Sequence, residues 1–519
     1  MPSIYNYKFH PELMIRTPAY SYKTYSNQIH KILNDPYYRS AIYLASRSLY
    51  DVLEKKNFDY ALLSEREQVS LRMYFNRMCF RPTPFALFSA FSSISWELEN
   101  RELVLSNIRK VHVQLDNGFL SELITKEKPG ISQKYVLNKS LYKAGNEYRY
   151  LRYGQNNENG KRDFWIDSIE LTHEIKDVLS FCAKYRTRPQ LINFISELFE
   201  EDIDECSCFF EELIEKQILL PELLPNITGE DYLDRIINSQ EVGNANLPQL
   251  KEIKSMIIGL NDSHHMLLPE NIIETSCKIR QLTGSIENNK SKLYVNTEMG
   301  GVKGGLSRDL QAKILEGLFC IDKLLPNQQS NALSKFVSAY KQKFDQRWIP
   351  LMTALDPEIG VGYESLAENY HSSPLMKNIQ LSYCYNSEQK IEWTSSHALL
   401  LNKWNTLQTA NGDIPTITLD NADLKNLSDH RTNLHFPPGI SVLFRKVGES
   451  VYIEQAGGVT ATALLGRFTP LNLNIRETVR NIARIEESSI LDIIFAEIVH
   501  ICDPDLMNSR LKSLTHPGI

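Results

Sequence analysis

The chain has 519 residues, a formal net charge of −6 and a hydrophobic content of 42%. The charge argues against a globally basic nucleic-acid binder, and the apolar content argues against a disordered chain. The length suggests about three or four domains. No cysteine pair has zinc-ligand spacing and no apolar run reaches the roughly 18 residues of a membrane span. We therefore expect reduced thiols, no membrane span and a cytoplasmic protein.

The N-terminal region begins extended and continues as a helix. Arg16-Thr17-Pro18 closes the extended part, and proline holds this segment out of helical geometry, so Arg16 projects from a stiff strand exit. Apolar residues then recur at helical spacing, which predicts one helix over Tyr37–Lys55.

The stretch Ser64–Phe91 predicts a helix, a sharp break and a buried anchor. Ser64 and Glu67 have the spacing of a capping box at the start of the helix. Pro82 and Pro84 end it, because proline lacks the donor that a helix needs.

Two arginines and a hydroxyl flank this break. Arg77 and Arg81 are one turn apart and share a helix face, and Thr83 stands between the two prolines. This set suits a phosphate or carboxylate site. The alternative is a helix end at which arginines only complement the dipole.

The same stretch resembles a family signature. Arg77-Met-Cys-Phe-Arg81-Pro-Thr83-Pro-Phe-Ala-Leu-Phe is similar to the R-x-x-x-R-x-T-P-F-G-L-F element of the lantibiotic dehydratases, with Ala86 where most members have glycine. That departure bears on local backbone geometry. An R-T-P near the N-terminus supplies an active-site arginine in this family, so the resemblance implies that role for Arg16.

The chain then returns to strands. Ser92–Leu98, Leu103–Leu105 and Val111–Asp116 are predicted strands, followed by a helix over Asn117–Thr125. Asp116 is either the N-cap of that helix or, as the resemblance implies, part of the active site. Both roles can hold together.

Residues 130–225 predict a separate unit with a winged helix-turn-helix arrangement. A ribbon precedes three helices that begin at His173, Pro189 and Asp202, and a closing strand follows at Ile218–Leu223. The ribbon strands are Tyr135–Ser140, Tyr148–Tyr153 and Phe164–Leu171.

The charge of this unit differs from that expected of a DNA-binding winged helix-turn-helix domain. Nine acidic residues lie between Glu197 and Glu215, which would repel phosphates, whereas the ribbon is rich in lysine and arginine. An edge strand beside an apolar and acidic helix suits a peptide added as an extra strand. The resemblance implies recognition of a precursor's leader peptide, and the alternative is an internal structural domain. The candidate contact residues are Phe164, Ile166, Ile169, Phe210 and Leu213.

Residues 226–330 predict helices and then a strand over Ser291–Thr297. The glycines between Gly300 and Gly305 lack the spacing of a phosphate-binding loop and predict a flexible turn. Asn296 stands where the family commonly has aspartate, which removes a carboxylate from this corner of the site.

Two further elements resemble the family. Asp356-Pro-Glu-Ile-Gly360-Val-Gly362-Tyr363 is similar to D-P-E-x-G-I-G-Y, and its surroundings predict a helix, a strand and a turn. A hairpin over Ser441–Gln455 leads to Leu465-Gly466-Arg467-Phe468, whose glycine and apolar walls favour a fixed cation. The resemblance implies an active-site role for Arg467. The helix Ile475–Glu487 follows.

The sequence thus predicts an α+β fold of several subdomains with mixed sheets and an embedded winged helix-turn-helix element. The predicted divisions are residues 1–129, the leader-recognition element over 130–225, and residues 226–519. The resemblance covers the N-terminal, amino-acid-transferring region of the family. We expect the elimination domain of full-length relatives to be absent, with the chain a split subunit or a truncated fragment.

The resemblance implies transfer of glutamate from glutamyl-tRNA to Ser and Thr of a precursor peptide, the first half of dehydration. Expected partners are the precursor, the charged tRNA as co-substrate, a separate elimination protein, a cyclase and a second copy in a homodimer, with no DNA and no organic or metal cofactor. The alternatives are a peptide aminoacyl-tRNA ligase that extends a scaffold peptide, and a non-catalytic leader-binding scaffold. The expected catalytic residues are Arg16, Arg77, Arg81, Thr83, Asp116 and Arg467.

Overall fold

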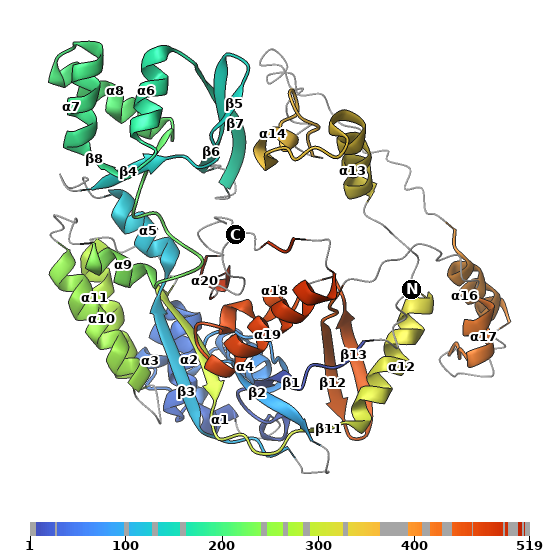
Figure 1. Cartoon of the computed structure of the whole chain (residues 1–519). Coiled ribbons are helices and arrows are strands. Elements are labelled where there is room, and N and C mark those ends of the chain that lie inside the picture. The colour runs from blue at the N-terminus through green and yellow to red at the C-terminus, as the bar shows by residue number, and fades with distance from the viewer. Residues whose placement is uncertain are drawn as a thin grey trace.

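A computed structural model describes most of the chain (Figure 1). The described residues are 7–25, 29–97, 103–126, 133–155, 162–239, 246–262, 268–283, 291–324, 331–363, 393–406, 416–427, 438–458, 460–490, 494–496, 507–510 and 513. In this part of the chain, no helix is both long and apolar enough to cross a membrane.

The centre of the molecule is a mixed sheet in the order β1-β2-β10-β3, with β11 beside β2. β1 is antiparallel to β2, β2 is parallel to β10, and β10 is antiparallel to β3. The strands are β1 (Glu12–Pro18), β2 (Ser89–Glu97), β3 (Arg109–Leu115), β10 (Leu293–Met299) and β11 (Leu306–Ser307).

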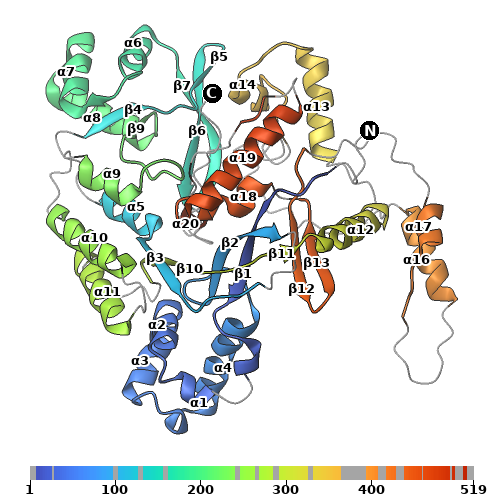
Figure 2. The same ribbon diagram turned by 60° about the horizontal axis from the view of Figure 1, so that its bottom comes forward.

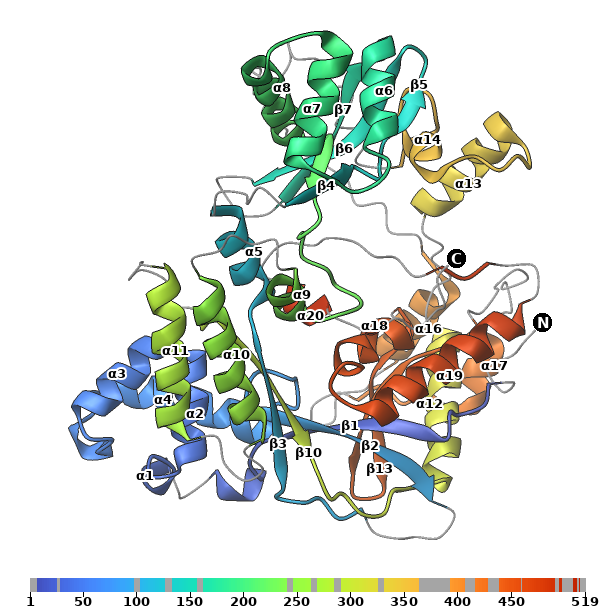
Figure 3. The same ribbon diagram turned by 60° about the vertical axis from the view of Figure 1, so that its left-hand side comes forward.

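Helices from three separate regions of the sequence cover one face of this sheet (Figure 3). Their apolar side chains share a single core with alternate residues of β3 and β10, such as Val113 and Val295. The helices are α1 (Ile29–Ile32), α2 (Pro36–Ala45), α3 (Arg47–Lys55), α4 (Glu65–Phe80), α5 (Asn117–Lys126), α9 (Tyr232–Asn238), α10 (Leu247–Asp262) and α11 (Pro269–Thr283), with 3-10 turns η2 (Tyr22–Thr24) and η3 (Tyr60–Leu62).

The opposite face is covered by the C-terminal part of the chain (Figure 2). Phe468, Ile475 and Val479 pack there against Phe91 of β2. A hairpin and α12 pack together beside the end of β2. These elements are α12 (Asp309–Leu324), β12 (Val442–Val447), β13 (Ser450–Ala456), α18 (Ala461–Leu465), η4 (Gly466–Phe468), α19 (Leu473–Ser489) and α20 (Met507–Arg510).

A smaller unit with its own core lies beyond the end of this layered body (Figure 3). It contains a sheet in the order β8-β4-β9, a sheet in the order β5-β6-β7, and three helices. Its elements are β4 (Lys134–Leu137), β5 (Tyr142–Ala144), β6 (Glu147–Gln155), β7 (Arg162–Glu170), α6 (His173–Phe181), β8 (Arg186–Thr187), α7 (Arg188–Phe199), α8 (Ile203–Glu215) and β9 (Leu219–Pro221).

Of the remaining helices, α13 and α14 lie next to the smaller unit, and α16 and α17 lie at the right-hand side of Figure 1. They are α13 (Asn331–Phe344), α14 (Leu351–Leu355), α16 (Ser395–Asn405) and α17 (Asn421–Asn426).

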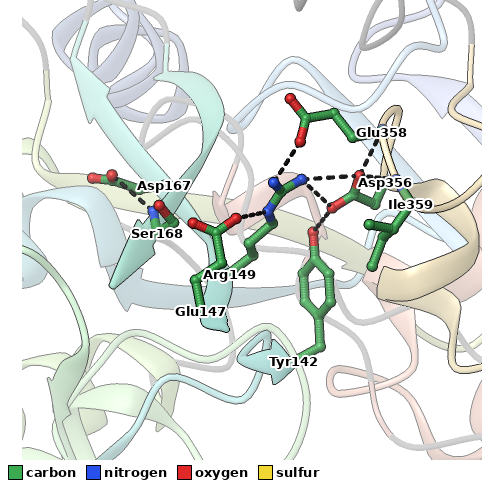
Figure 4. Close-up of polar contacts among 8 residues, drawn as sticks. All are labelled: Tyr142, Glu147, Arg149, Asp167, Ser168, Asp356, Glu358 and Ile359. Atoms are coloured by element: carbon green, nitrogen blue, oxygen red, sulfur yellow. Dashed lines mark hydrogen bonds and ion pairs between the residues drawn. The ribbon is translucent and has the colours of Figure 1, made fainter. Parts of the chain in front are cut away.

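The segment after α14 is joined to the smaller unit by a buried ion-pair cluster (Figure 4). The fully buried Asp356 carboxylate accepts hydrogen bonds from the Tyr142 hydroxyl at 2.6 Å and the Arg149 guanidinium at 3.1 Å. It also accepts the backbone N–H groups of Glu358 and Ile359. Because β5 and β6 carry Tyr142 and Arg149, the cluster fixes the ribbon to the Pro-Glu-x-Gly turn.

The α+β fold class is confirmed, as are the two longer ribbon strands, the three helices and the closing strand of the smaller unit. The strand expected over Tyr135–Ser140 forms as β4, but in the described part of the chain it pairs with β8 and β9 instead of the ribbon. The capping box of Ser64 and Glu67 is also present, and α4 ends before Pro82. The winged helix-turn-helix assignment itself and the domain divisions stay predictions.

Three predictions of local structure were wrong. The helix over residues 37–55 is two helices, because Ser46 takes an extended conformation and its side chain accepts the Leu49 N–H. Val104 of the expected strand 103–105 makes only an isolated bridge to Lys303. The strand expected before the Asp356 turn is the short helix α14, whose N-cap is Pro350.

Candidate active site

One face of the central sheet carries a row of chemically active side chains. In the strand register, Arg16 of β1 pairs with Phe91 of β2, and Phe91 pairs with Glu298 of β10. Two residues along, Asn296 of β10 pairs with His112 of β3. Since residues two apart in a strand share a face, this row lies under the C-terminal elements.

The short turn η4 places Arg467 over this row. Phe468 is fully buried and its ring lies 4.6 Å from the Phe91 ring, centroid to centroid, which anchors the turn. The Arg467 guanidinium donates to the Tyr294 hydroxyl at 2.8 Å and to Asn296 Oδ1 at 3.1 Å.

Arg16 reaches the same place from β1. Its guanidinium lies 5.4 Å from the Phe468 ring centroid, and that of Arg467 lies 5.1 Å from the same centroid. Arg16 also donates to the Leu464 carbonyl at 3.4 Å. Burial lowers the pKa of Arg16, and the charge of Arg467 lowers this pKa further. Among the described residues, neither arginine has a carboxylate partner.

Arg77 and Arg81 form a second cationic pair at the entry to β2. The Arg77 guanidinium lies over the Phe85 ring, 4.3 Å from its centroid, and 5.7 Å from that of Phe88. Burial lowers the pKa of Arg77, and the neighbouring charge of Arg81 adds to this. Arg81 is exposed, and so is Thr83.

The two arginine pairs lie near phenylalanines that are close together in the chain. Phe88 precedes Phe91 by three residues, which separates their Cα atoms by at most about 10 Å. The Ala19 N–H donates to the Phe88 carbonyl at 3.0 Å. This hydrogen bond connects the end of β1 to the phenylalanine over which Arg77 lies. The structure brings Arg16 to Arg467 and Arg77 to Arg81, with separate contacts for each pair.

Two of these arginines keep unused donors. Within the described part of the chain, the Nε atoms of Arg77 and Arg467 are buried and have no hydrogen-bond partner. A buried donor without a partner is energetically costly, so the described residues do not fully satisfy either guanidinium.

Asp116 is a helix cap. Its Oδ1 accepts the Phe119 N–H at 2.8 Å, and its Oδ2 accepts the side-chain amide of Asn508 in α20. Since α20 also packs against η4, Asp116 braces the turn that holds Arg467. An active-site role for Asp116 stays a prediction.

Sequence reasoning missed a polar network beside the arginines. Glu298 accepts from His112 Nε2 at 2.8 Å and from the Asn472 amide at 2.6 Å. Burial alone would raise the pKa of Glu298, but these hydrogen bonds hold it below its ordinary value. Period-two alternation places Tyr294 and Asn296 of the predicted strand on one face, and continuing it by one residue adds Glu298, so this alternation was the available signal. No sequence signal predicted that Glu298 pairs with His112.

The predicted leader-contact residues fall into two groups. Phe164, Ile166 and Ile169 are half-buried on β7, which pairs only with β6 among the described strands. Phe210 and Leu213 are buried in the core of the smaller unit, with Phe210 against Tyr135. As buried side chains they offer a ligand no surface, so their assignment as contacts is corrected.

The fold has known neighbours. The tRNA-dependent lantibiotic dehydratase MibB from Microbispora sp. 107891 superposes with a TM-score of 0.67 at 16% identity, over 90% of this chain and 46% of that one. The glutamylation domain of TbtB, from thiomuracin biosynthesis, gives a TM-score of 0.57 at 12% identity, over 91% of this chain and 57% of that one.

Proteins that are similar in sequence point to the same family as the structural neighbours. The epidermin biosynthesis protein EpiB of Staphylococcus epidermidis is 24% identical over 78% of this chain and 42% of its own length. The subtilin biosynthesis protein SpaB of Bacillus subtilis is 20% identical over 88% of this chain and 44% of its own. The chain thus spans less than half the length of these relatives. The model of the lantibiotic dehydratase N-terminus matches residues 34–508, and the chain therefore belongs to that family.

Proposed function

We propose that the chain transfers glutamate from glutamyl-tRNA to Ser and Thr hydroxyls of a ribosomally made precursor peptide. Its family, and neighbours whose names include tRNA dependence and glutamylation, support this reaction. A separate elimination protein or domain would then remove the glutamate, and a cyclase would follow.

The observation that carries the proposal is the pair Arg16 and Arg467 on one phenylalanine. The two cations are partly buried and lack a carboxylate partner among the described residues. Burial lowers the pKa of Arg16 most, and repulsion by the charge of Arg467 lowers it further. Such an arrangement is stabilised by an anion. In glutamyl transfer, that anion is a phosphate of the tRNA end, the glutamyl carboxylate or the oxyanion of the tetrahedral intermediate.

The chemistry asks mainly for positioning and charge. The tRNA ester is already activated, so a Ser or Thr hydroxyl can attack it once the two are aligned. Arginines aimed at the developing oxyanion would stabilise the transition state. We assign this role to Arg467 and Arg16, and assign the tRNA phosphates to Arg77 and Arg81, with Thr83 as a further donor.

The smaller unit would hold the peptide. Its β7 has a free edge among the described strands, and Arg149 and Arg152 lie on the neighbouring strand β6. An extended leader can add to such an edge through main-chain hydrogen bonds. Phe164 and Ile166 are the side chains on β7 that we propose to contact it.

Mass spectrometry tests the function directly. The chain is incubated with glutamyl-tRNA and a Ser/Thr-rich precursor peptide, and we expect addition of one or more glutamyl residues to that peptide. Arg467→Ala should abolish the addition, whereas Arg480→Ala, which removes an exposed ion pair with Glu477, should not. A peptide of unchanged mass would refute the transferase, and an amino acid added at its C-terminus would indicate a ligase instead.

A further inference from the structure

A histidine–carboxylate pair lies beside the arginines, and the mechanism above does not use it. His112 Nε2 and Glu298 Oε2 are 2.8 Å apart, and their side chains are 14% and 16% exposed. Asn472 at the start of α19 donates to the other Glu298 oxygen at 2.6 Å. The carboxylate therefore has both oxygens occupied and a fixed orientation.

Two sets of contacts place this pair near Arg16 and Arg467. The His112 ring stacks on Phe91 with a centroid distance of 6.4 Å, and Phe91 contacts Phe468, over which both arginines lie. His112 also lies directly across from Asn296, and Asn296 accepts from Arg467. Cross-strand neighbours have Cβ atoms about 5 Å apart. The side chains of Arg467 and His112 are therefore both neighbours of Asn296.

The contact with Glu298 decides which ring nitrogen is basic. An ionised carboxylate only accepts hydrogen bonds, so Nε2 carries a proton, and in the neutral imidazole Nδ1 is then the nitrogen that keeps its lone pair. Among the described residues, Nδ1 has no hydrogen-bond partner. A neutral imidazole that is oriented by a carboxylate and has one free nitrogen is the usual general base for a hydroxyl nucleophile.

We propose that His112 is the general base of the transfer and that Glu298 is its positioning residue, an inference that rests on the proposed function. As the acceptor oxygen forms its bond to the ester carbonyl carbon, its proton passes to His112 Nδ1. When the tetrahedral intermediate collapses, the bond from carbon to the ribose oxygen breaks. The imidazolium then returns the proton to that oxygen, so atoms and charge balance.

The competing role is structural, since the pair also ties β3, β10 and α19 together. A pH profile separates the roles, because only a base makes the rate follow its own titration. The charged or titratable groups around His112 are Glu298 and Tyr294 on β10, Lys110 on its own strand, Arg16 on β1 and Arg467 in η4.

The experiment measures single-turnover transfer from glutamyl-tRNA to the peptide across pH. We expect His112→Ala and His112→Gln to lower the rate by about 100- to 10,000-fold and to flatten its acidic limb. Added imidazole should partly restore His112→Ala, and Glu298→Gln should shift the limb. The exposed His173→Ala serves as the control and should change nothing.

The outcomes distinguish the two proposals. If the wild-type chain transfers nothing, the proposed function fails. If the wild type transfers but the folded His112 variants keep its rate, or lose rate with the pH profile unchanged and no imidazole rescue, His112 is not the base. Thermal melting of each variant shows whether it is folded.

Discussion

At the scale of single residues, motif spacing identified the arginines but did not predict the residues that surround them. Arg16 and Arg467 lie in elements that the sequence marks, so they were identifiable. Glu298 and His112 are 186 positions apart, and their contact depends on a strand pairing that no local pattern encodes. For the same reason Asn296 was predicted as a lost carboxylate, and its bond to Arg467 was not.

Ala86 gives a residue-scale prediction. Its φ is +46°, a left-handed conformation that costs most L-residues about 1–2 kcal/mol relative to glycine. Glycine removes this backbone cost in the folded state, but it also makes the unfolded chain more flexible, which offsets part of the gain. Ala86→Gly should therefore raise the free energy of unfolding by about 0.5 kcal/mol. Urea denaturation measures it.

A matched alanine supplies the control. Ala61, in the 3-10 turn η3, has no positive φ, and Ala61→Gly should lower the free energy of unfolding by about 0.5–1 kcal/mol. If both substitutions destabilise equally, the backbone at residue 86 is not strained.

At the scale of elements, caps and prolines predicted ends well, whereas periodicity overlooked breaks. Ser64 and Pro82 set the two ends of α4 as expected. Ser46 interrupts an apolar pattern that runs on through α3, because its side chain caps the next helix. The buried Phe210 shows a related limit: periodicity finds an apolar face but does not say whether that face meets a ligand or a core.

The cluster around Asp356 gives an element-scale prediction. Asp356→Ala leaves the Arg149 charge and the Tyr142 hydroxyl without their buried acceptor, so we expect a loss of about 3 kcal/mol in the free energy of unfolding. Glu358→Gln acts on a carboxylate that is 47% exposed and should cost less than about 1 kcal/mol. Equal losses for both would mean that the buried carboxylate has no special role.

The same cluster predicts a pH dependence. Burial would raise the pKa of Asp356, but hydrogen bonds from Tyr142, from backbone N–H groups and from Arg149 hold it below the ordinary 3.8. Its contribution to stability is therefore complete above pH 3.8 and is lost as the pH falls through the lower folded value. Urea midpoints between pH 2 and 5 should fall less steeply for Asp356→Asn than for the wild type.

At the scale of the whole molecule, the sheet assembles its active face from segments far apart in the chain. β1 and β2 come from the first hundred residues, β10 from the middle and η4 from the last quarter. The order of family elements predicted this class of fold. It did not predict which strand lies next to which, because the parallel pairing of β2 with β10 joins elements about 200 residues apart.

The central claim is that Arg16 and Arg467 serve one site, and a double-mutant cycle on the single-turnover rate of glutamyl transfer tests it most directly. Residues that act on the same group lose their effects non-additively. We predict that Arg16→Ala combined with Arg467→Ala is little slower than the slower single variant. Losses that simply multiply, or single variants as fast as the wild type, would contradict the claim.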